Sequence, residues 1–258
     1  MTKINSVAVS FPYFARQHNE LKRPAISGDR EMNRTLTLNG HEAAVLARAA
    51  FMAGLDHDEA EGLRACATVL LCDPHDVLFE EGDKAAYFYC VLSGYVRLYR
   101  HNGDGRQADI RICEPGDSFA ECLIHTAETY RYGAQAMDHA VLARFHIPKV
   151  RLLLEERPRI GKAIMRSLSL HLISTMECLA SDRMQTAPQR VANYLLTHCV
   201  EDGAAASLRL PFPKNLLARK LGLAPEALSR AFSTLKTRGV TVRGRAIAIS
   251  DIKVLRQI

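Results

Sequence analysis

The stretch Lys214–Val242, KNLLARKLGLAPEALSRAFSTLKTRGVTV, predicts two short helices joined by a glycine turn. The first helix should end at Gly222, because glycine most easily takes the left-handed conformation that closes a helix. Pro225 suits the first turn of a second helix, because its φ is already helical and its missing N–H has no partner there. The second helix should continue to Gly239. The sequence therefore predicts a helix-turn-helix unit.

The second helix has one apolar and one polar face. Spacings of four and three residues give an apolar stripe, formed by Leu228, Phe232 and Leu235. The opposite face is polar and partly basic, and it carries Glu226, Ser229, Arg230, Ser233 and Lys236. A carboxylate, a hydroxyl and a guanidinium within little more than one turn supply the acceptors and donors that read base edges in the DNA major groove. The pattern favours a DNA-reading helix, although a solvated amphipathic helix shares it.

The sequence that follows predicts a wing. Val240–Val242 and Ala246–Ile249 are short strand candidates, and the basic tripeptide Arg243-Gly244-Arg245 joins them as a hairpin tip. A hairpin directly after a helix-turn-helix unit is typical of a winged DNA-binding domain. We expect this domain to cover residues 182–258.

Charge is unevenly divided along the chain. The whole chain has a formal net charge of +6. Residues 182–258 hold 13 lysines and arginines against 5 acidic residues, a net +8, so the other 181 residues carry −2. A basic module joined to a mildly acidic one indicates double-stranded DNA as the partner of the first and a different role for the second.

Length and composition describe the rest of the chain. The 258 residues can form two domains, and 48% hydrophobic residues can supply a core for each. No apolar run is long enough to cross a membrane, so we expect a soluble, cytoplasmic protein without a membrane partner. Seven cysteines are scattered without a Cys-x-x-Cys pair, which favours reduced thiols. Residues 1–42 should form a flexible leader, and Met32 offers an alternative start that would exclude residues 1–31.

Residues 43–147 predict an antiparallel β-roll that serves as a sensor domain. Short β-type segments are separated by glycines 11 or 12 residues apart, at Gly82, Gly94, Gly105 and Gly116. Between the glycines apolar and polar residues alternate, and Ile110 and Ile112 are expected to face the core while Asp109 and Arg111 face solvent. The interior of such a roll can hold a small-molecule effector.

Residues 148–181 predict a long helix. Apolar residues recur at spacings of three and four along it, at Ile160, Ile164, Leu168, Leu172, Met176 and Leu179. A long helix with one apolar seam between two domains favours a homodimer interface, although packing within one subunit would give a similar pattern. We expect the two copies to meet along residues 158–180.

The order of these parts resembles the CRP/FNR superfamily of bacterial transcription regulators from about Ala43 to Asp251. The strings that carry the resemblance are Phe79-Glu80-Glu81-Gly82-Asp83, Leu92-Ser93-Gly94-Tyr95-Val96-Arg97, Gly116-Asp117-Ser118-Phe119-Ala120-Glu121 and Pro225-Glu226-Ala227-Leu228-Ser229-Arg230. The resemblance implies an α+β fold with a cyclic-nucleotide-binding-like jelly roll, a dimerisation helix and a C-terminal winged helix-turn-helix. It also implies a cytoplasmic, non-enzymatic regulator that works with RNA polymerase.

The resemblance assigns roles to four residues of the helix-turn-helix unit. The pattern of Glu226, Ser229 and Arg230 is similar to the FNR side of the family, which reads TTGAT half-sites in a palindromic operator. By this resemblance Glu226 and Arg230 contact base edges, and Ser229 helps to select the outer thymine. Lys214 would hold a DNA phosphate.

The sequence alone does not identify the effector. Glu121, Arg131 and Thr175 match the spacing of the cyclic-nucleotide-binding members, but another alignment puts Tyr130 in the place of the arginine. Phe119-Ala120-Glu121 and Ala134-Gln135-Ala136 resemble the nitric-oxide-responsive, haem-binding regulators of denitrification instead. That resemblance makes haem a cofactor candidate, with His41, His57, His125 and His171 as histidines that could bind it. The oxygen-sensing iron–sulfur branch needs an N-terminal cysteine cluster, and no cysteine precedes Cys66.

Other classes fit the sequence less well. A cupin-type metalloenzyme would share the roll but needs a His-x-His motif, which the chain lacks. Neither a nucleophile–base constellation nor a phosphate-binding glycine loop is present. A cyclic-nucleotide-binding interaction module without DNA activity would leave the net +8 of the C-terminal module without a role.

Overall fold

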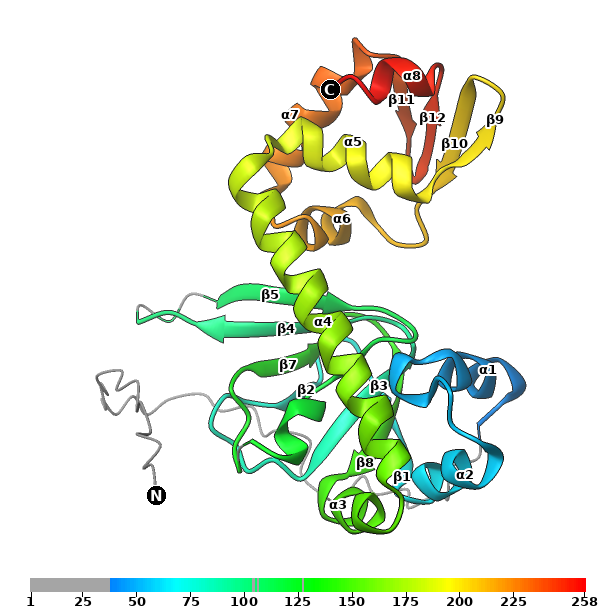
Figure 1. Ribbon diagram of the computed structural model, residues 1–258. Helices are drawn as coiled ribbons and strands as arrows, with labels where there is room; N and C mark the ends of the chain where they lie inside the picture. Colours follow the sequence, from blue (N-terminus) through cyan, green and yellow to red (C-terminus); the bar gives the residue numbers. More distant parts are fainter. Residues whose placement is uncertain (1–37, 104, 106, 127) are drawn as a thin grey trace, which may run out of the picture.

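A computed structural model describes residues 38–103, 105, 107–126 and 128–258 of the chain. These residues form a β-rich N-terminal domain, a long helix α4 (Pro158–Met184), and a smaller C-terminal domain at the far end of that helix (Figure 1). The architecture is the α+β arrangement that the sequence predicts. None of the helices in these ranges has the length and apolar content that crossing a membrane requires.

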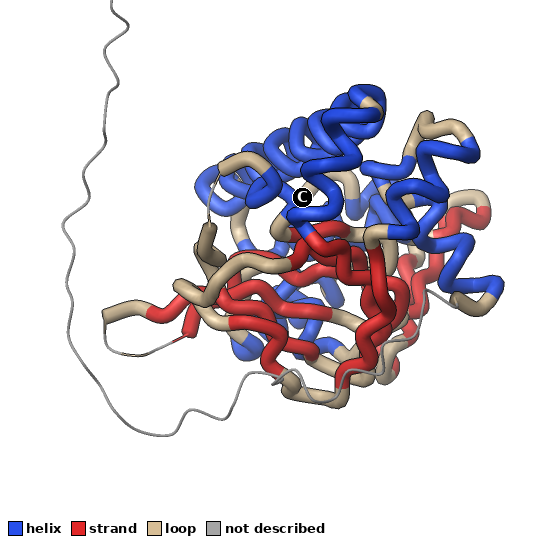
Figure 2. Tube along the Cα trace, turned by 90° about the horizontal axis from the view of Figure 1, so that it is seen from below, coloured by secondary structure: helices blue, strands red, loops and turns tan. Residues whose placement is uncertain are grey.

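Two four-stranded antiparallel sheets form the body of the N-terminal domain, with strand orders β1-β8-β3-β6 and β2-β7-β4-β5. The strands are β1 (Ala67–Cys72), β2 (Val77–Phe79), β3 (Tyr87–Ser93), β4 (Val96–His101), β5 (Gln107–Cys113), β6 (Ser118–Phe119), β7 (Gly133–Ala136) and β8 (Ala140–His146). Helices gather on one side of the sheets (Figure 2). They are α1 (Gly40–Arg48), the 3-10 helices η2 (Ala50–Met52) and η3 (Glu121–Ile124), α2 (His57–Ala65) and α3 (Ile147–Glu156).

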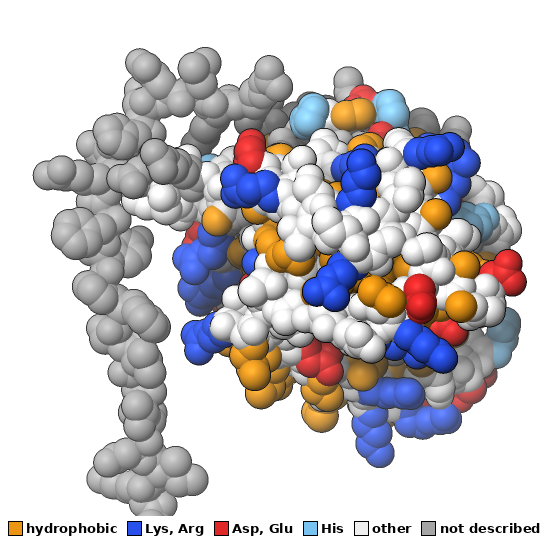
Figure 3. Space-filling view, turned by 90° about the horizontal axis from the view of Figure 1, so that it is seen from above, with side chains coloured by type: hydrophobic (Ala, Val, Ile, Leu, Met, Phe, Trp, Pro, Cys, Tyr) orange, Lys and Arg blue, Asp and Glu red, His pale blue; other side chains and the backbone are white. Residues whose placement is uncertain are grey.

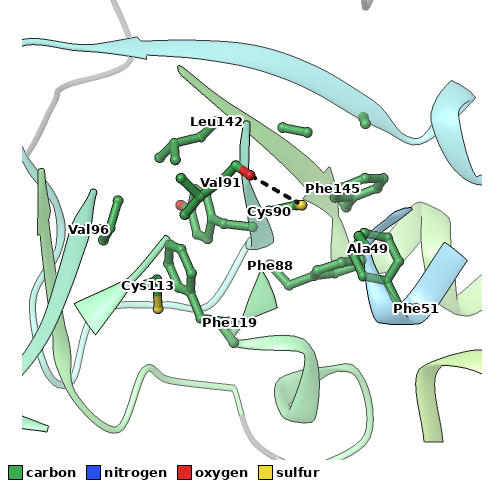
Figure 4. Packing of buried hydrophobic residues seen from close by; sticks show 14 of the residues in the cluster. Ala49, Phe51, Phe88, Cys90, Val91, Val96, Cys113, Phe119, Leu142 and Phe145 are labelled. Carbon is green, nitrogen blue, oxygen red and sulfur yellow. Dashed lines mark hydrogen bonds between the residues drawn. The ribbon is translucent and has the colours of Figure 1, made fainter. Parts of the chain in front are cut away.

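Aromatic side chains join these helices to the sheet. Phe88 of β3 and Phe145 of β8 are paired across the two strands, and their rings stack with centroids 4.6 Å apart. Phe51 of η2 packs edge-on against Phe88 at 5.6 Å (Figure 4). All three side chains are fully buried. The helical layer therefore completes the core of the roll, because it removes this apolar sheet face from water.

The evenly spaced glycines lie at turns of the roll. Gly82, Gly94, Gly105 and Gly116 all have positive φ, between 76° and 97°. Only glycine takes this conformation without strain. Gly94 has a second constraint, because a Cβ there would lie 2.4 Å from the carbonyl oxygen of His139. The spacing that predicted a roll therefore has a physical cause in the turns.

The predicted alternation on β5 is wrong. Ile110 is 54% exposed, and Ile112 is buried among side chains of the C-terminal domain, although both were expected to face the roll core. Arg111 was expected to face solvent, but its guanidinium lies 2.9 Å from the carboxylate of Asp117 and is partly enclosed.

A β-bulge explains this difference. Arg111 pairs with Leu98 of β4, whereas Asp109 pairs with the next residue of β4, so Ile110 has no partner in the ladder. One extra residue breaks the two-residue alternation of a strand and redirects the side chains beyond it. As a result, Asp109 and Ile112 face the same side of the sheet.

The single helix expected from residue 148 onward is two helices. Helix α3 ends at Glu156, and α4 begins at Pro158. Between them Arg157 has a non-helical backbone, with φ −132° and ψ 79°. Proline disfavours a helical conformation in the residue before it, which explains the break, while its own fixed φ suits the first turn of α4.

The two halves of α4 have different environments. Ile160 and Ile164 are buried in the core of the roll, and Leu168 packs against that core. Farther along, Leu172 and Met176 are 62% and 63% exposed. The predicted seam is thus continuous in sequence, but its first half packs within the subunit and only its second half is exposed.

The C-terminal domain has its own sheet and core. Its helices are α5 (Ala187–His198), α6 (Lys214–Lys220), α7 (Pro225–Lys236) and α8 (Ile252–Leu255). Its sheet has the order β11-β12-β10-β9, formed by β9 (Val200–Asp202), β10 (Ala205–Arg209), β11 (Val240–Arg243) and β12 (Ala246–Ile249). Buried residues from all four helices and three of the strands form a second core cluster.

Most of the expected leader, residues 1–37 with its alternative start, lies outside the described residues. Helix α1 begins at Gly40, inside the range 1–42 that the sequence assigned to the leader. The side chain of Asn39 accepts a hydrogen bond from the backbone N–H of Glu42, and the Glu42 carboxylate accepts one from the N–H of Asn39. This reciprocal capping box gives α1 a defined start before residue 43.

Candidate DNA-binding surface and effector pocket

Local signals position α7, the candidate reading helix. Gly222 closes the turn after α6 with φ 59°, and Pro225 occupies the first turn of α7. On the inner face Leu228, Ala231 and Leu235 are buried. Phe232 is only half-buried, and Ala231 takes a core position that the apolar stripe did not include. The helix is therefore anchored by its inner face and presents the other face to solvent.

The structure brings the four candidate DNA contacts onto one side of the C-terminal domain. Glu226, Ser229 and Arg230 of α7 are exposed, as are the two further polar residues of that face, Ser233 and Lys236. Lys214, the first residue of α6, is half-buried, and its Nζ lies 6.0 Å from the centroid of the Phe232 ring. Figure 3, which looks down on the end of the molecule formed by this domain, shows more Lys and Arg than acidic side chains on the visible surface.

A hollow of about 480 Å³ lies between α6, α7 and β11. Lys214, Ser229 and Ser233 line it together with the basic residues Lys236 and Arg243. Its apolar lining includes Leu228 and Val240 of the domain core, and Phe232 and Val242, which pack against that core. A concave, basic surface between a reading helix and a wing can accept a DNA backbone, because lysine and arginine neutralise the phosphate charge.

The effector pocket candidate Glu121 is almost fully buried, with 2% of its surface exposed. Ser118 donates a hydrogen bond to Glu121 Oε1 over 2.9 Å, and Nδ1 of His171 on α4 lies 2.8 Å from the same oxygen. The Oγ atom of Ser167, also on α4, is 3.5 Å from that of Ser118. Burial would raise the pKa of the Glu121 carboxyl, but His171 and Ser118 outweigh it and hold that pKa below its usual range.

The backbone before Glu121 adopts an unusual conformation. Ala120 has φ 66° and ψ 5°, in the left-handed region that favours glycine. Alanine holds this left-handed turn although it carries a Cβ, and the Ala120 N–H donates a hydrogen bond to the hydroxyl oxygen of Tyr132 over 3.1 Å.

Tyr130 and Arg131 point to different environments. Tyr130 is 3% exposed, donates its O–H to the backbone carbonyl of Tyr87 over 2.8 Å, and stacks on Phe79 with ring centroids 3.6 Å apart. Arg131 is exposed. Of the two residues that the alternative alignments offered, Tyr130 therefore takes the inner position, and Arg131 does not share the interior with Glu121.

Aromatic rings fill the region of the roll around Tyr130. Phe79 lies within 5.6 Å of Tyr89 and 6.1 Å of Tyr132, measured between ring centroids. Tyr89 in turn stacks on Phe119 at 5.1 Å. The interior that could hold an effector is therefore largely packed with the protein's own side chains.

Sequence reasoning missed three polar residues near Glu121: Arg111, Ser118 and Ser167. Arg111 donates a hydrogen bond to the backbone carbonyl of Ser118 over 3.4 Å, so the guanidinium that approaches Glu121 comes from β5. The bulge in β5 hid this position from the alternation pattern. Ser167 follows Ile160 and Ile164 at helical spacing, and the structure buries it fully. A serine on the apolar side of a helix was the available signal in the sequence, because a buried hydroxyl needs a hydrogen-bond partner.

The remaining candidates lie elsewhere. Thr175 is exposed on α4 and donates its O–H to the backbone carbonyl of His171 over 2.7 Å. Of the four histidines considered for haem, His41, His57 and His125 are exposed, whereas His171 is half-buried against Glu121. The structure therefore distinguishes His171 from the other three.

Comparison with known proteins identifies both domains. The profile described as "Cyclic nucleotide-binding domain" matches residues 70–157, and the profile "Crp-like helix-turn-helix domain" matches residues 189–258. The chain is 24% identical over 212 residues to the "CRP-like cAMP-activated global transcriptional regulator" of Mycobacterium tuberculosis, covering 80% of this chain and 95% of the other. It is 29% identical to the nitrogen fixation regulation protein FixK of Rhizobium meliloti, covering 72% and 84%.

A solved structure is also similar over most of its length. It is the crystal structure of a protein from Ruegeria pomeroyi described as cyclic nucleotide binding. That chain is 32% identical to this one, the match covers 85% of this chain and 98% of the other, and the TM-score is 0.60.

Proposed function

Because the chain belongs to the CRP/FNR family of DNA-binding transcription regulators, we propose that it binds a palindromic operator with TTGAT-like half-sites as a homodimer. The proteins of this family are regulators rather than enzymes. A regulator of this kind acts on the chromosome through RNA polymerase, so we place its action in the cytoplasm with RNA polymerase as a further partner.

The exposed face of α7 carries the proposal for the operator. Glu226 and Arg230 are one helical turn apart and both exposed, so both side chains can enter one major groove. A carboxylate accepts a hydrogen bond from cytosine N4, and a guanidinium forks onto guanine O6 and N7. Ser229 lies between them on the same exposed face and can contact a neighbouring base or phosphate.

The exposed half of α4 supports the homodimer. Leu172, Met176 and Leu179 are 62%, 63% and 49% exposed and follow one another at spacings of four and three residues. A second copy related by a two-fold axis would cover this stripe and present two reading helices to a palindrome. Matched symmetry of protein and operator is what a palindromic site requires.

The test of this function is an operator preference. Fluorescence anisotropy should show the purified protein binding a labelled TTGAT-N4-ATCAA duplex about a thousandfold more tightly than random DNA of the same length. The measurement should be made with and without added haem and nitric oxide. Failure to prefer the palindrome under every one of these conditions would contradict the proposal.

For the effector we propose haem, which His171 would hold through a ring nitrogen. His171 Nδ1 lies 2.8 Å from the Glu121 carboxylate, and no hydrogen bond to its Nε2 occurs within the described ranges. A carboxylate that holds one ring nitrogen fixes the tautomer and directs the other nitrogen toward a metal. Haem would supply an iron that binds nitric oxide. Because His171 is on α4, its position is linked directly to the helix proposed to form the dimer.

We expect a visible spectrum to test this assignment. Protein loaded with haem should show a Soret band that shifts on addition of nitric oxide, and His171→Gln should change the band because it removes the ligand. The matched control, His125→Gln, replaces an exposed histidine and should leave the spectrum unchanged. Equal spectra for both variants would exclude His171 as the ligand, and failure to bind haem would favour an unliganded or thiol-controlled regulator.

Cyclic AMP is the second effector candidate, because the mycobacterial relative is named as cAMP-activated. The packing of the roll disfavours it in this chain. Arg131 is exposed, and the buried Tyr130 offers no positive charge to a phosphate. A hydrogen bond between charged groups contributes about 1.5–3 kcal/mol, so its absence should weaken binding at least about tenfold relative to a receptor with a buried arginine.

Titration calorimetry with cyclic AMP measures this directly. We expect weak binding that Arg131→Ala leaves unchanged, because the side chain already faces solvent. Nanomolar binding that Arg131→Ala abolishes would favour the cyclic-nucleotide-dependent regulator instead.

A further inference from the structure

The C-terminal domain is docked on the roll of its own subunit. Helix α6 lies beside β5 (Figure 1), and Ile112 of β5 is buried within the core cluster of the C-terminal domain. Tyr95, in the turn between β3 and β4, packs edge-on against the buried Phe212 with ring centroids 5.5 Å apart. A residue of one domain thus completes the core of the other.

We propose that this contact fixes the orientation of the DNA-binding domain on the roll and thereby sets the spacing between the two half-sites of the operator. The residues that fix it are Asp109, Ile112 and Glu114 of the β5 face, with Arg219 and Lys220 of α6. This inference rests on the palindromic binding proposed above, and it adds which residues determine the spacing.

The bulge in β5 creates the docking face. It places Asp109 and Ile112 on the same side of the sheet, facing α6, whereas strict alternation would put them on opposite sides. Ile112 supplies an apolar contact, and Asp109 beside it supplies a charge. The register irregularity therefore produces a mixed apolar and acidic surface from one short strand.

Ion pairs hold the C-terminal end of α6 to this surface. Arg219 Nη1 lies 3.1 Å from Asp109 Oδ2, and the other oxygen of Asp109 accepts a hydrogen bond from Arg97 of β4 over 3.3 Å. Lys220 pairs with Glu114, the residue that directly follows β5. Each pair joins one enclosed and one exposed side chain, since Asp109 and Lys220 are 17% and 18% exposed and their partners Arg219 and Glu114 are 44% and 43% exposed, so water and salt screen these pairs only in part.

A second attachment lies at the start of the turn between α6 and α7, directly after Lys220. Arg190 of α5 pairs with Asp182 near the end of α4 and donates a hydrogen bond to the backbone carbonyl of Leu221 over 3.0 Å. The turn that orients α7 is therefore tied to the end of α4 on one side, while α6 is tied to the roll on the other. Two separate attachments restrict rotation of the domain better than one.

The docking contact leaves the DNA-reading residues free. It uses Arg219 and Lys220 at the C-terminal end of α6, whereas Lys214 is at the other end of that helix. Glu226 and Arg230 remain exposed on α7. The contact therefore orients the reading helix and does not cover it.

Orientation matters because two reading helices must enter successive major grooves about 34 Å apart. With both domains docked, the geometry of the α4 dimer determines that separation. If the domains were released, the α4–α5 connection would act as a flexible joint and tolerate several separations, at lower affinity for each. Rigid docking therefore predicts a sharp dependence of affinity on spacer length.

The experiment is a set of operators in which the spacer between TTGAT and ATCAA varies from two to eight base pairs. Wild type should bind the operator with one particular spacer at least about tenfold more tightly than operators whose spacers are two base pairs longer or shorter. The ratio of these affinities is the spacer ratio. Asp109→Lys with Glu114→Lys should reduce this ratio to about threefold or less, because it repels Arg219 and Lys220. Adding Arg219→Glu with Lys220→Glu should restore the ratio by exchanging the charges.

Two further variants control for folding and for charge. Asp109→Asn with Glu114→Gln removes the ion pairs without reversing charge, and it should also broaden the spacer dependence. This variant replaces the reversed variant in the test if the reversed variant fails to fold. Glu201→Lys breaks the Arg256–Glu201 pair within the C-terminal domain and should keep the wild-type ratio. Broadening in Glu201→Lys equal to that in the Asp109 and Glu114 variants would overturn the proposal.

Amide hydrogen exchange tests the docking independently of DNA. The amides of β5 and α6 should exchange faster in the reversed variant and return to wild-type rates in the charge-exchanged variant. Unchanged exchange rates in the reversed variant would show that these ion pairs do not hold the C-terminal domain on the roll. Faster exchange together with an unchanged spacer ratio would show that docking does not set the half-site spacing. Either result would overturn the proposal. If wild type did not prefer the palindrome over random DNA, the result would instead contradict the proposed function on which the docking proposal rests.

Discussion

Replacing Leu172 and Met176 with glutamate should convert the dimer into a folded monomer. Both side chains are more than three-fifths exposed in one subunit, so the subunit tolerates the change, but the partner would bury them. Four carboxylates in one dimer seam would lack partners, and burying an unpaired charge is costly. Sedimentation velocity at micromolar concentration should show one species of half the wild-type mass, and operator affinity should fall with it.

The choice of residues follows from the environment of α4. Leu168, which the sequence placed in the same seam, packs against the core of the roll, so a charge there would test folding of the subunit and not dimerisation. Leu152→Glu is the matched control, because Leu152 is 63% exposed on α3, away from the stripe, and the variant should remain a dimer. A wild type that sediments as a monomer with and without DNA would show that the stripe has another role.

Arg230→Ala should weaken binding to the TTGAT-N4-ATCAA duplex by about ten- to a hundredfold, because a bidentate arginine–guanine contact contributes about 1–3 kcal/mol of discrimination. Arg230 is exposed and makes no ion pair within the part of the chain that the structure describes, so its removal should not destabilise the domain. Affinity for random DNA should change less, since non-specific binding depends on the other basic residues. Anisotropy titrations on both duplexes measure the difference.

Lys214→Ala should have a different effect. Removing one phosphate contact should lower affinity for all sequences alike and reduce the slope of log affinity against log salt by about one. The two variants therefore separate base reading from phosphate binding in one salt series. Indistinguishable behaviour of Arg230→Ala and Lys214→Ala on specific and random duplexes would contradict the assignment of α7 as the reading helix.

The fold was largely predictable because its signals are local. Gly222 and Pro225 define the turn before α7 by their own backbone preferences, and the structure places the turn there. The evenly spaced glycines of the roll are a local signal of the same kind, since each requires a positive φ. The break between α3 and α4 was equally local, and Pro158 could have predicted it.

The effector pocket was less predictable because it depends on strand register and on contacts between distant segments. An extended segment reverses its inner and outer faces when the alignment shifts by one residue, so spacing alone could not choose between Tyr130 and Arg131. The bulge at Ile110 moved Arg111 inward for a similar reason. The contact of Glu121 with His171 joins residues far apart in the chain, and a single sequence contains no signal for that pairing.

The divided environment of α4 has a consequence for gene dosage. The first half of α4 completes the core of its own roll, so a subunit that separates from its partner keeps this core. The dimer can therefore dissociate into folded subunits. Assembly is then governed by mass action between folded chains. While chains remain mostly separate, operator occupancy should rise with the square of their concentration, so that doubling expression raises occupancy about fourfold. A cell could therefore obtain a switch-like response from a small change in the amount of this protein, before any effector is bound.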